Sequence, residues 1–184
     1  MPSSWLKRVV NEARAACLSF AAYKRQFFDF RRRPGYRGWE NWLTVEIGRR
    51  LNTRSVLTFA PYHGVKNGRR LDLLVDSCNP KVAVEIKVNY LDDDEIRSWV
   101  PGDAGLPVRV LRDRNKLEGL PVEFSRLLLV STCFDSHPGL IKYKGVVDRT
   151  LPIDFPGWRA EWYDCSNTKL EGWTLLLALS RRRA

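Results

Sequence analysis

The sequence predicts an α/β domain with a central mixed β-sheet flanked by helices. Three observations lead to this fold class. Apolar residues recur at steps of three or four in the first quarter of the chain, as in amphipathic helices. Short alternating or continuous apolar runs follow, as in strands. A charged segment with helical periodicity then separates two groups of these strands, which indicates an α/β layout with a mixed sheet.

Composition indicates one globular domain with a basic surplus. The chain has 184 residues, of which 44% are hydrophobic and 28% are charged, enough to build a core. Lys and Arg outnumber Asp and Glu by 31 to 21, which gives a formal net charge of +10. A surplus of this size favours a polyanionic partner such as nucleic acid. Many small basic proteins carry a similar charge without such a partner, so charge alone does not decide.

Several classes of protein are not indicated. The four cysteines and two histidines are too scattered for a zinc site or a disulfide framework. No apolar stretch approaches the ~20 residues that cross a bilayer, so no membrane partner is expected. Glu12 and Arg14 interrupt the apolar region that a signal peptide would need. We therefore expect a cytoplasmic protein, while a transit peptide remains compatible with the Arg-rich start.

Residues 1–37 are the most basic segment, and the sequence predicts a basic helical arm here, followed by a single domain over 38–184. Apolar residues from Trp5 to Phe27 recur at helical spacing, so the segment is predicted to be an amphipathic helix. Two interpretations stay open. The segment is either an arm that lies over a phosphate backbone or a helix that caps the core with its basic face in solvent.

A second amphipathic helix is predicted over 39–51, after Pro34 and Gly35 break the chain. It carries two acids, Glu40 and Glu46, on or beside its apolar stripe. At about 100° per residue, both acids lie within roughly 60° of the centre of that stripe. Either carboxylate can therefore face the core, which is unfavourable unless the carboxylate has a partner or a function.

The remaining elements are predicted from alternation and turn residues. In the strand predicted over 81–88, four branched side chains face one way, while Ala83, Glu85 and Lys87 face the other. A loop is expected through His137-Pro138. The other strands are predicted over 55–62, 69–76, 125–134, 158–165 and 172–180, with a helix over about 107–119.

Charged residues in two of these strands suggest a metal site. Asp72 lies within the strand over 69–76, and Glu85 and Lys87 lie on the next strand, joined to it by a short turn. Mg²⁺ prefers carboxylate and carbonyl oxygens, so Asp72, Glu85 and the backbone carbonyl of Ile86 can converge on one ion. Lys87 shares a strand face with Glu85, where its ammonium can position water or stabilise charge on a phosphate.

This arrangement resembles the PD-(D/E)XK nuclease superfamily. The matching residues are Asp72 in "RLDLLV" and Glu85, Ile86 and Lys87 in "VAVEIKV", after a helix that carries an acid. The resemblance spans about residues 36–134, and Leu71 stands where the motif usually has proline. The alternative is a half-exposed sheet face on which Glu85 and Lys87 pair with strand neighbours, worth at most about 1 kcal/mol.

The resemblance implies a restriction-endonuclease-like core and a metal-dependent nuclease that hydrolyses phosphodiester bonds, in DNA rather than RNA. Asp72, Glu85 and Ile86 would hold Mg²⁺ or Mn²⁺, Lys87 would act on water or phosphate charge, and Glu46, in preference to Glu40, would complete the site. A homodimer would suit the cutting of two strands. The residues expected to contact nucleic acid are Arg31, Arg32, Arg33, Arg69 and Arg70.

A different class of function is also compatible with these residues. A catalytically inactive module that binds nucleic acid or another protein can keep the fold and the acidic residues, because fold does not imply function. Metal dependence separates the two classes, since a binding module should hold DNA equally well in a chelator.

Overall fold

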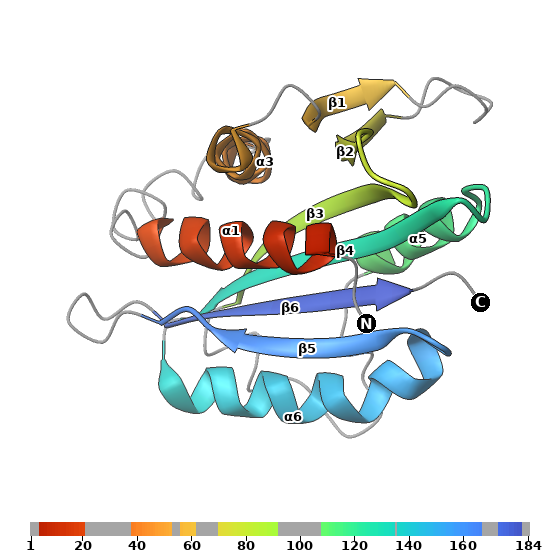
Figure 1. Cartoon of the computed structure of the whole chain (residues 1–184). Helices are drawn as coiled ribbons and strands as arrows, with labels where there is room; N and C mark the ends of the chain where they lie inside the picture. The colour runs from red at the N-terminus through yellow and green to blue at the C-terminus, as the bar shows by residue number, and fades with distance from the viewer. Residues whose placement is uncertain are drawn as a thin grey trace.

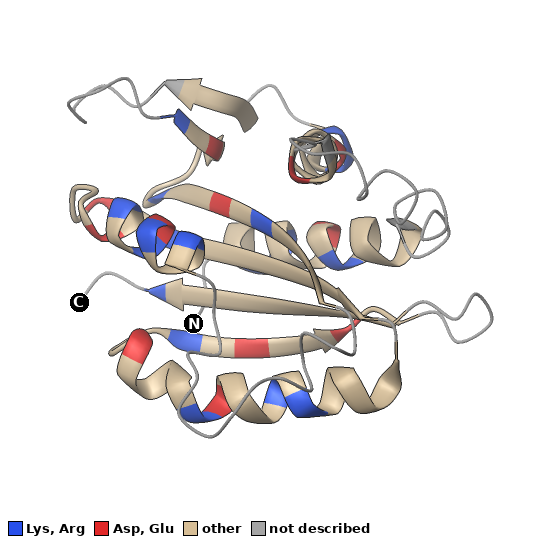
Figure 2. Ribbon diagram, turned by 180° about the vertical axis from the view of Figure 1, so that it is seen from behind, with Lys and Arg blue, Asp and Glu red and all other residues tan. Residues whose placement is uncertain are grey.

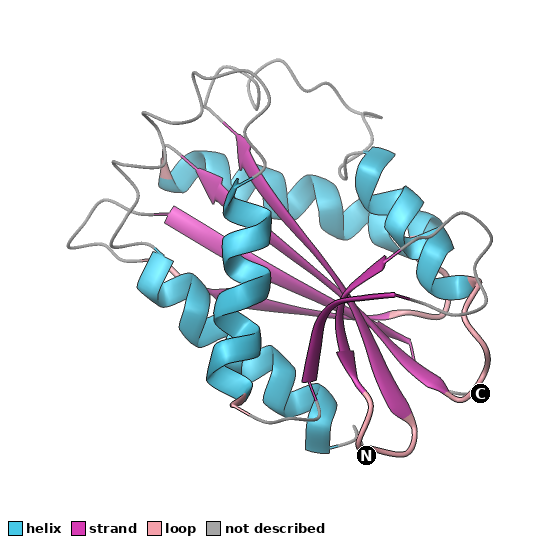
Figure 3. Ribbon diagram, turned by 90° about the horizontal axis from the view of Figure 1, so that it is seen from above, coloured by secondary structure: helices cyan, strands magenta, loops and turns pink. Residues whose placement is uncertain are grey.

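The computed structural model describes residues 4–20, 38–52, 56–61, 70–91, 108–134, 136–166 and 173–181. Over these ranges the protein is an α/β domain in which a six-stranded mixed sheet is flanked by four helices (Figure 1). The predicted coarse fold class is therefore confirmed. Seen from above, helices cover both faces of the sheet (Figure 3).

The strands lie in the order β1-β2-β3-β4-β6-β5. Only β3 and β4 are parallel to each other, and the other neighbouring pairs are antiparallel. Helix α5 makes the crossover that parallel strands require. The elements are α1 (Ser4–Phe20), α3 (Gly38–Leu51), β1 (Val56–Pro61), β2 (Arg70–Val75), β3 (Lys81–Leu91), α5 (Val108–Glu118), β4 (Phe124–Phe134), α6 (His137–Asp154), β5 (Arg159–Asp164) and β6 (Trp173–Arg181).

Alternation along the strands divides the core into two layers. On β3, Val82, Val84 and Ile86 pack with α1 and α3, whereas Ala83 packs on the opposite side with α5 and α6. This is the alternation that the sequence predicts for this strand. The acid and the lysine that follow Ala83 by two and four residues therefore face the α5 side. No helix in the described ranges is both long and apolar enough to cross a membrane.

Helix α1 belongs to the core. Val9, Ala13 and Ala16 are fully buried and pack in the same cluster as α3 and the sheet. Ser4–Phe20 is therefore a capping helix, which corrects the interpretation of this part as an arm outside the domain. The rest of the predicted arm, with Arg31, Arg32 and Arg33, lies outside the described residues.

Helix α6 stands where the sequence predicts a loop. The hydroxyl of Ser136 caps the helix by accepting a hydrogen bond from the backbone N–H of Gly139 at 3.2 Å. Pro138 lies in the first turn, where its missing N–H removes no helical hydrogen bond. Buried Tyr143 and Val147 then anchor the helix to the sheet. The prediction is wrong because proline and glycine here begin a helix instead of a turn.

Arg126 of β4 fixes the C-terminal end of α5. Its side chain is buried, and the guanidinium donates to the carbonyl of Leu117 at 2.7 Å and to that of Leu120 at 2.6 Å. Carbonyls at a helix C-terminus lack helical partners and favour a cation. This contact holds α5 against the sheet at the end of the helix that lies beside the acids of β2 and β3.

We predict that Arg126→Met destabilises the domain. The variant keeps an apolar stem but leaves buried carbonyls without their charged donor, which should lower the free energy of unfolding by about 2 kcal/mol. Urea denaturation followed by circular dichroism measures this change. The control is Arg159→Met, an exposed arginine of β5, which should stay close to the wild-type midpoint. Equal midpoints for the Arg126 variant and wild type would contradict the assigned role.

Candidate active site

The site forms where β2 and β3 stop pairing. Their register runs only from Val75↔Val82 to Leu73↔Val84, and β3 beyond this point is hydrogen-bonded to β4 on its other edge. Asp72 comes next on β2. Its Oδ2 accepts the backbone N–H of Ile86 at 2.7 Å, in place of a backbone carbonyl. The Asp72 carboxylate is thereby fixed next to the segment of β3 that carries the other charged residues.

Glu85 is the most buried acid of the site, with only 2% of its surface exposed. Lys116 of α5 places its Nζ 2.5 Å from Glu85 Oε1, but this ion pair lacks hydrogen-bond geometry, and Oε1 has no hydrogen bond within the described residues. Burial and the nearby charge of Asp72 raise the pKa of Glu85 to about 8, against the lowering effect of Lys116. The two carboxylates thus repel each other in a confined space.

The pKa of the Asp72 carboxyl is also above its usual value. Burial is the main cause, and the hydrogen bond from Ile86 and the charge of Lys87 act in the opposite direction. Both acids are therefore held in a setting that disfavours their negative charge. A bound cation would relieve that cost directly.

Lys87 lies between the two helices that flank the site. Its Nζ is 2.8 Å from Glu40 Oε1 of α3 and 2.9 Å from Asp113 Oδ2 of α5, and it donates to the Ile86 carbonyl at 3.0 Å. Burial alone would lower the pKa of Lys87, but the ion pairs with Glu40 and Asp113 outweigh it and raise the pKa. Lys87 is therefore a firmly held cation that donates hydrogen bonds to Glu40 and to the Ile86 carbonyl and forms an ion pair with Asp113.

The geometry favours Glu40 over Glu46 as the acid of α3 beside Lys87, against the preference drawn from the sequence. Glu46 Oε1 lies 2.8 Å from both Arg49 and Arg50, one turn further along the same helix. The hydrogen bond from Arg49 is the main cause that lowers the pKa of Glu46. Glu46 is occupied locally by residues at i+3 and i+4, and Glu40 is the acid that α3 brings to Lys87.

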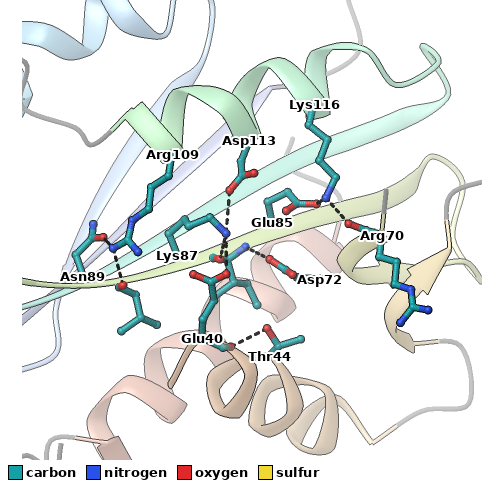
Figure 4. A network of polar contacts seen from close by, with 12 residues as sticks. Glu40, Thr44, Arg70, Asp72, Glu85, Lys87, Asn89, Arg109, Asp113 and Lys116 are labelled. Carbon is teal, nitrogen blue, oxygen red and sulfur yellow. Dashed lines mark hydrogen bonds and ion pairs between the residues drawn. The ribbon is translucent and has the colours of Figure 1, made fainter. Parts of the chain in front are cut away.

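Helix α5 contributes a set of charged residues that the sequence analysis does not identify (Figure 4). Successive side chains on one face of β3 meet successive side chains of α5 in reverse order. Arg109 also donates to the carbonyl of Val88 at 2.9 Å. The three contacts are Glu85 with Lys116, Lys87 with Asp113, and Asn89 with Arg109.

A signal for Asp113 was present in the sequence. Asp113 lies three residues after Val110 and four before Leu117, both fully buried, so it is an acid on the apolar stripe of α5. The same argument picks out Glu40 on α3. Lys116 gives no such signal, because its contact with Glu85 depends on how α5 lies over β3.

The predicted phosphate-binding arginines are mostly outside the described residues. Arg69 and Arg31–Arg33 are among these, so their expected contact with nucleic acid stays a prediction. Arg70 is exposed at the start of β2, and its backbone carbonyl accepts a hydrogen bond from Lys116. Figure 2 shows basic and acidic segments side by side on β2, β3 and α5. The site is therefore of mixed charge and not simply basic.

The oxygen donors of the site suit a hard divalent cation. No three His, Cys, Asp or Glu side chains gather into a metal-binding group anywhere in the described part of the chain. Mg²⁺ commonly takes one or two protein carboxylates and completes its shell with water and phosphate oxygens. Asp72, Glu85 and the Ile86 carbonyl fit that pattern, and the Glu85 oxygen without a hydrogen bond is a natural donor. A structural zinc site would require four protein ligands.

Comparisons of the chain with protein-family models, with curated proteins and with solved structures find no match.

We predict that the metal-free protein loses stability as the pH rises through the titration of Glu85. Its pKa is about 8 in the folded protein against 4.5 for the free group, so the folded state holds a proton that the unfolded state has lost between these values. Stability should therefore fall from about pH 4.5 to about pH 8. Thermal melts in EDTA across this range measure the effect.

Glu85→Gln should remove this part of the pH dependence and melt at a higher temperature than wild type at pH 8.5. The matched control is Glu161→Gln, at a more exposed carboxylate of β5, which should keep the wild-type dependence. A wild-type slope in Glu85→Gln would show that Glu85 does not carry a raised pKa.

Proposed function

We propose that the protein is a metal-dependent nuclease with a restriction-endonuclease-like core that hydrolyses phosphodiester bonds, with DNA as the preferred substrate. One observation carries the proposal. A buried carboxyl group, Glu85, and a half-buried one, Asp72, lie beside a firmly held lysine at the point where β2 and β3 separate. A purely structural sheet face would have no need to bring two acids together out of water.

Each residue of the site would have a separate role. Asp72, Glu85 and the Ile86 carbonyl would hold Mg²⁺ or Mn²⁺, and the ion would supply positive charge next to the phosphate that reacts. Glu40 and Asp113 keep Lys87 charged and in place.

Lys87 would bind the attacking water or a phosphate oxygen. Of the three oxygens around its ammonium, that of the Ile86 carbonyl is the uncharged one, so this hydrogen bond is the easiest to exchange for a substrate oxygen. The two carboxylates would meanwhile keep the ammonium in place. Charge stabilisation by a group positioned in this way is a main source of catalysis at phosphate.

The basic composition supports a nucleic-acid substrate. The chain carries a formal net charge of +10, and phosphate contacts from exposed arginines such as Arg70 would draw the polyanion to the surface. Binding should accordingly weaken steeply with added salt. Nothing in this argument depends on the sequence of the bases.

A catalytically inactive binding module is the second candidate, and one observation favours it. The Lys87 ammonium already hydrogen-bonds to Glu40 and the Ile86 carbonyl and pairs with Asp113, so protein oxygens engage it in the absence of a substrate. Such a network can also persist as a structural element of the core. Binding that is unchanged by a chelator, together with no cleavage, would identify this class.

We predict that wild-type protein cuts DNA with Mg²⁺ or Mn²⁺ but not in EDTA, and that Lys87→Ala cuts about 10²–10³-fold more slowly. Linear, circular and single-stranded DNA, and RNA, are to be incubated and analysed on gels. Lys144→Ala, which removes an ion-paired lysine of α6, is the matched control and should cut like wild type. A folded wild type that cuts no substrate with either metal would refute the proposal.

Glu40→Gln and Glu46→Gln form a matched pair on one helix. We expect the Glu40 variant to cut about tenfold or more slowly, because the lysine loses a carboxylate that orients it. The Glu46 variant should keep a rate close to wild type, since its carboxylate binds only Arg49 and Arg50 of its own helix among the contacts described. Cleavage rates at saturating metal test this order, and the reverse order would assign the role to Glu46.

A further inference from the structure

The ammonium of Lys116 occupies the position beside the Glu85 carboxyl group that a bound metal ion would take. Its Nζ lies 2.5 Å from Glu85 Oε1, and it also donates to the backbone carbonyl of Arg70 at the start of β2. The ammonium therefore bridges the two strands of the acid pair. Its side chain is 13% exposed, so it keeps some contact with solvent.

A divalent ion at Asp72 and Glu85 would compete with Lys116. Both cations seek the same carboxylate oxygen, and two positive charges this close together in a poorly solvated site repel each other strongly. Either the ammonium leaves or the ion binds weakly. Departure of the ammonium is the favoured outcome, because a lysine side chain is long and has several rotatable bonds.

Lys116 is the more weakly held of the two lysines in the site. Lys87 has two carboxylates and one carbonyl around its ammonium, whereas the described partners of Lys116 are one carboxylate and one carbonyl. Arg109, the other cation of this face of α5, is engaged by Asn89 and the carbonyl of Val88. Lys116 is thus the cation of this helix face that an incoming ion would release.

We propose that Lys116 is a built-in counter-cation that pairs with the ionised form of Glu85 while no metal is bound, and that its ammonium moves to a phosphate oxygen of the nucleic acid when a divalent ion takes the carboxylate. The proposal rests on the proposed metal site at Asp72 and Glu85. It adds a substrate contact on α5, supplied by a residue outside the motif of β2 and β3. An ammonium suits this exchange because it binds carboxylate and phosphate as a point charge.

The first test measures metal affinity without nucleic acid. Isothermal titration of Mg²⁺ and Mn²⁺ into wild type and Lys116→Met should show about tenfold tighter binding to the variant, a difference equal to about 1.4 kcal/mol. Lys116→Arg keeps the charge and should bind close to wild type. Lys144→Met, which removes one distant positive charge, should also match wild type. A structural lysine would give no gain in affinity, so equal or weaker binding to Lys116→Met overturns the counter-cation role.

The second test measures catalysis at saturating metal. Lys116→Met should lower kcat/KM for DNA about tenfold despite its tighter metal binding, because the phosphate contact is lost, and Lys116→Arg should recover part of it. Unchanged kcat/KM would overturn the transfer to phosphate. Circular dichroism and thermal melts establish that each variant is folded, and Lys116→Arg keeps the test valid if Lys116→Met is unstable.

The two proposals fail in different ways. If wild type binds metal and cuts DNA but Lys116→Met binds metal no more tightly, the role of Lys116 is wrong and the nuclease stands. If neither wild type nor Lys116→Met binds metal, the metal site is wrong, and both proposals fall with it. Tighter metal binding by the variant without any cleavage by wild type would support the counter-cation and refute the nuclease.

Discussion

The hydrogen bond from the Ile86 N–H to Asp72 is the contact on which the site depends. A buried backbone N–H needs an acceptor, and here β2 supplies a carboxylate where its regular pairing with β3 ends. One bond therefore does two things. It closes the end of the β2–β3 ladder, and it brings Asp72 close enough to Glu85 for its charge to raise the pKa of that acid. The separation of the strands also leaves room for side chains from α3 and α5.

Helices α3 and α5 supply the acidic side chains that pair with the lysine of β3. Glu40 and Asp113 reach Lys87 from opposite sides, and the ion pairs keep a half-buried ammonium charged against the cost of burial. Removing water from charged groups costs several kcal/mol per group, so such a network is weak evidence for stability. Its arrangement is better explained by the need to hold groups in fixed positions. The buried guanidinium of Arg126 serves the same end by fixing the end of α5.

The features of the fold and site that could be predicted from the sequence are those that depend on local rules. Alternation along β3 places Glu85 and Lys87 on one face whatever the rest of the fold does, and the structure keeps this. The choice between Glu40 and Glu46 could not be made from helical angles, since Arg49 and Arg50 decide it by binding Glu46. The partners on α5 depend on the position of one helix over a strand, and no local rule gives that position. Helix α6 was missed because its proline and glycine lie in the first turn.

Under the proposed function, the charge of the site would couple the binding of metal to the binding of nucleic acid. Four carboxyl groups, Glu40, Asp72, Glu85 and Asp113, surround two ammonium groups, Lys87 and Lys116. The site therefore has a formal charge of −2 once the pH exceeds the pKa of Glu85, about 8, inside a chain of net charge +10. Under the proposed function, the positive net charge of the chain would attract a phosphate backbone, whereas the negative site would repel a phosphate until a metal ion is bound. A bound divalent ion would cancel that charge, and by linkage a bound phosphate would then strengthen the binding of the ion. Under the proposed function, a basic protein with an acidic site would engage a phosphodiester only with its metal present.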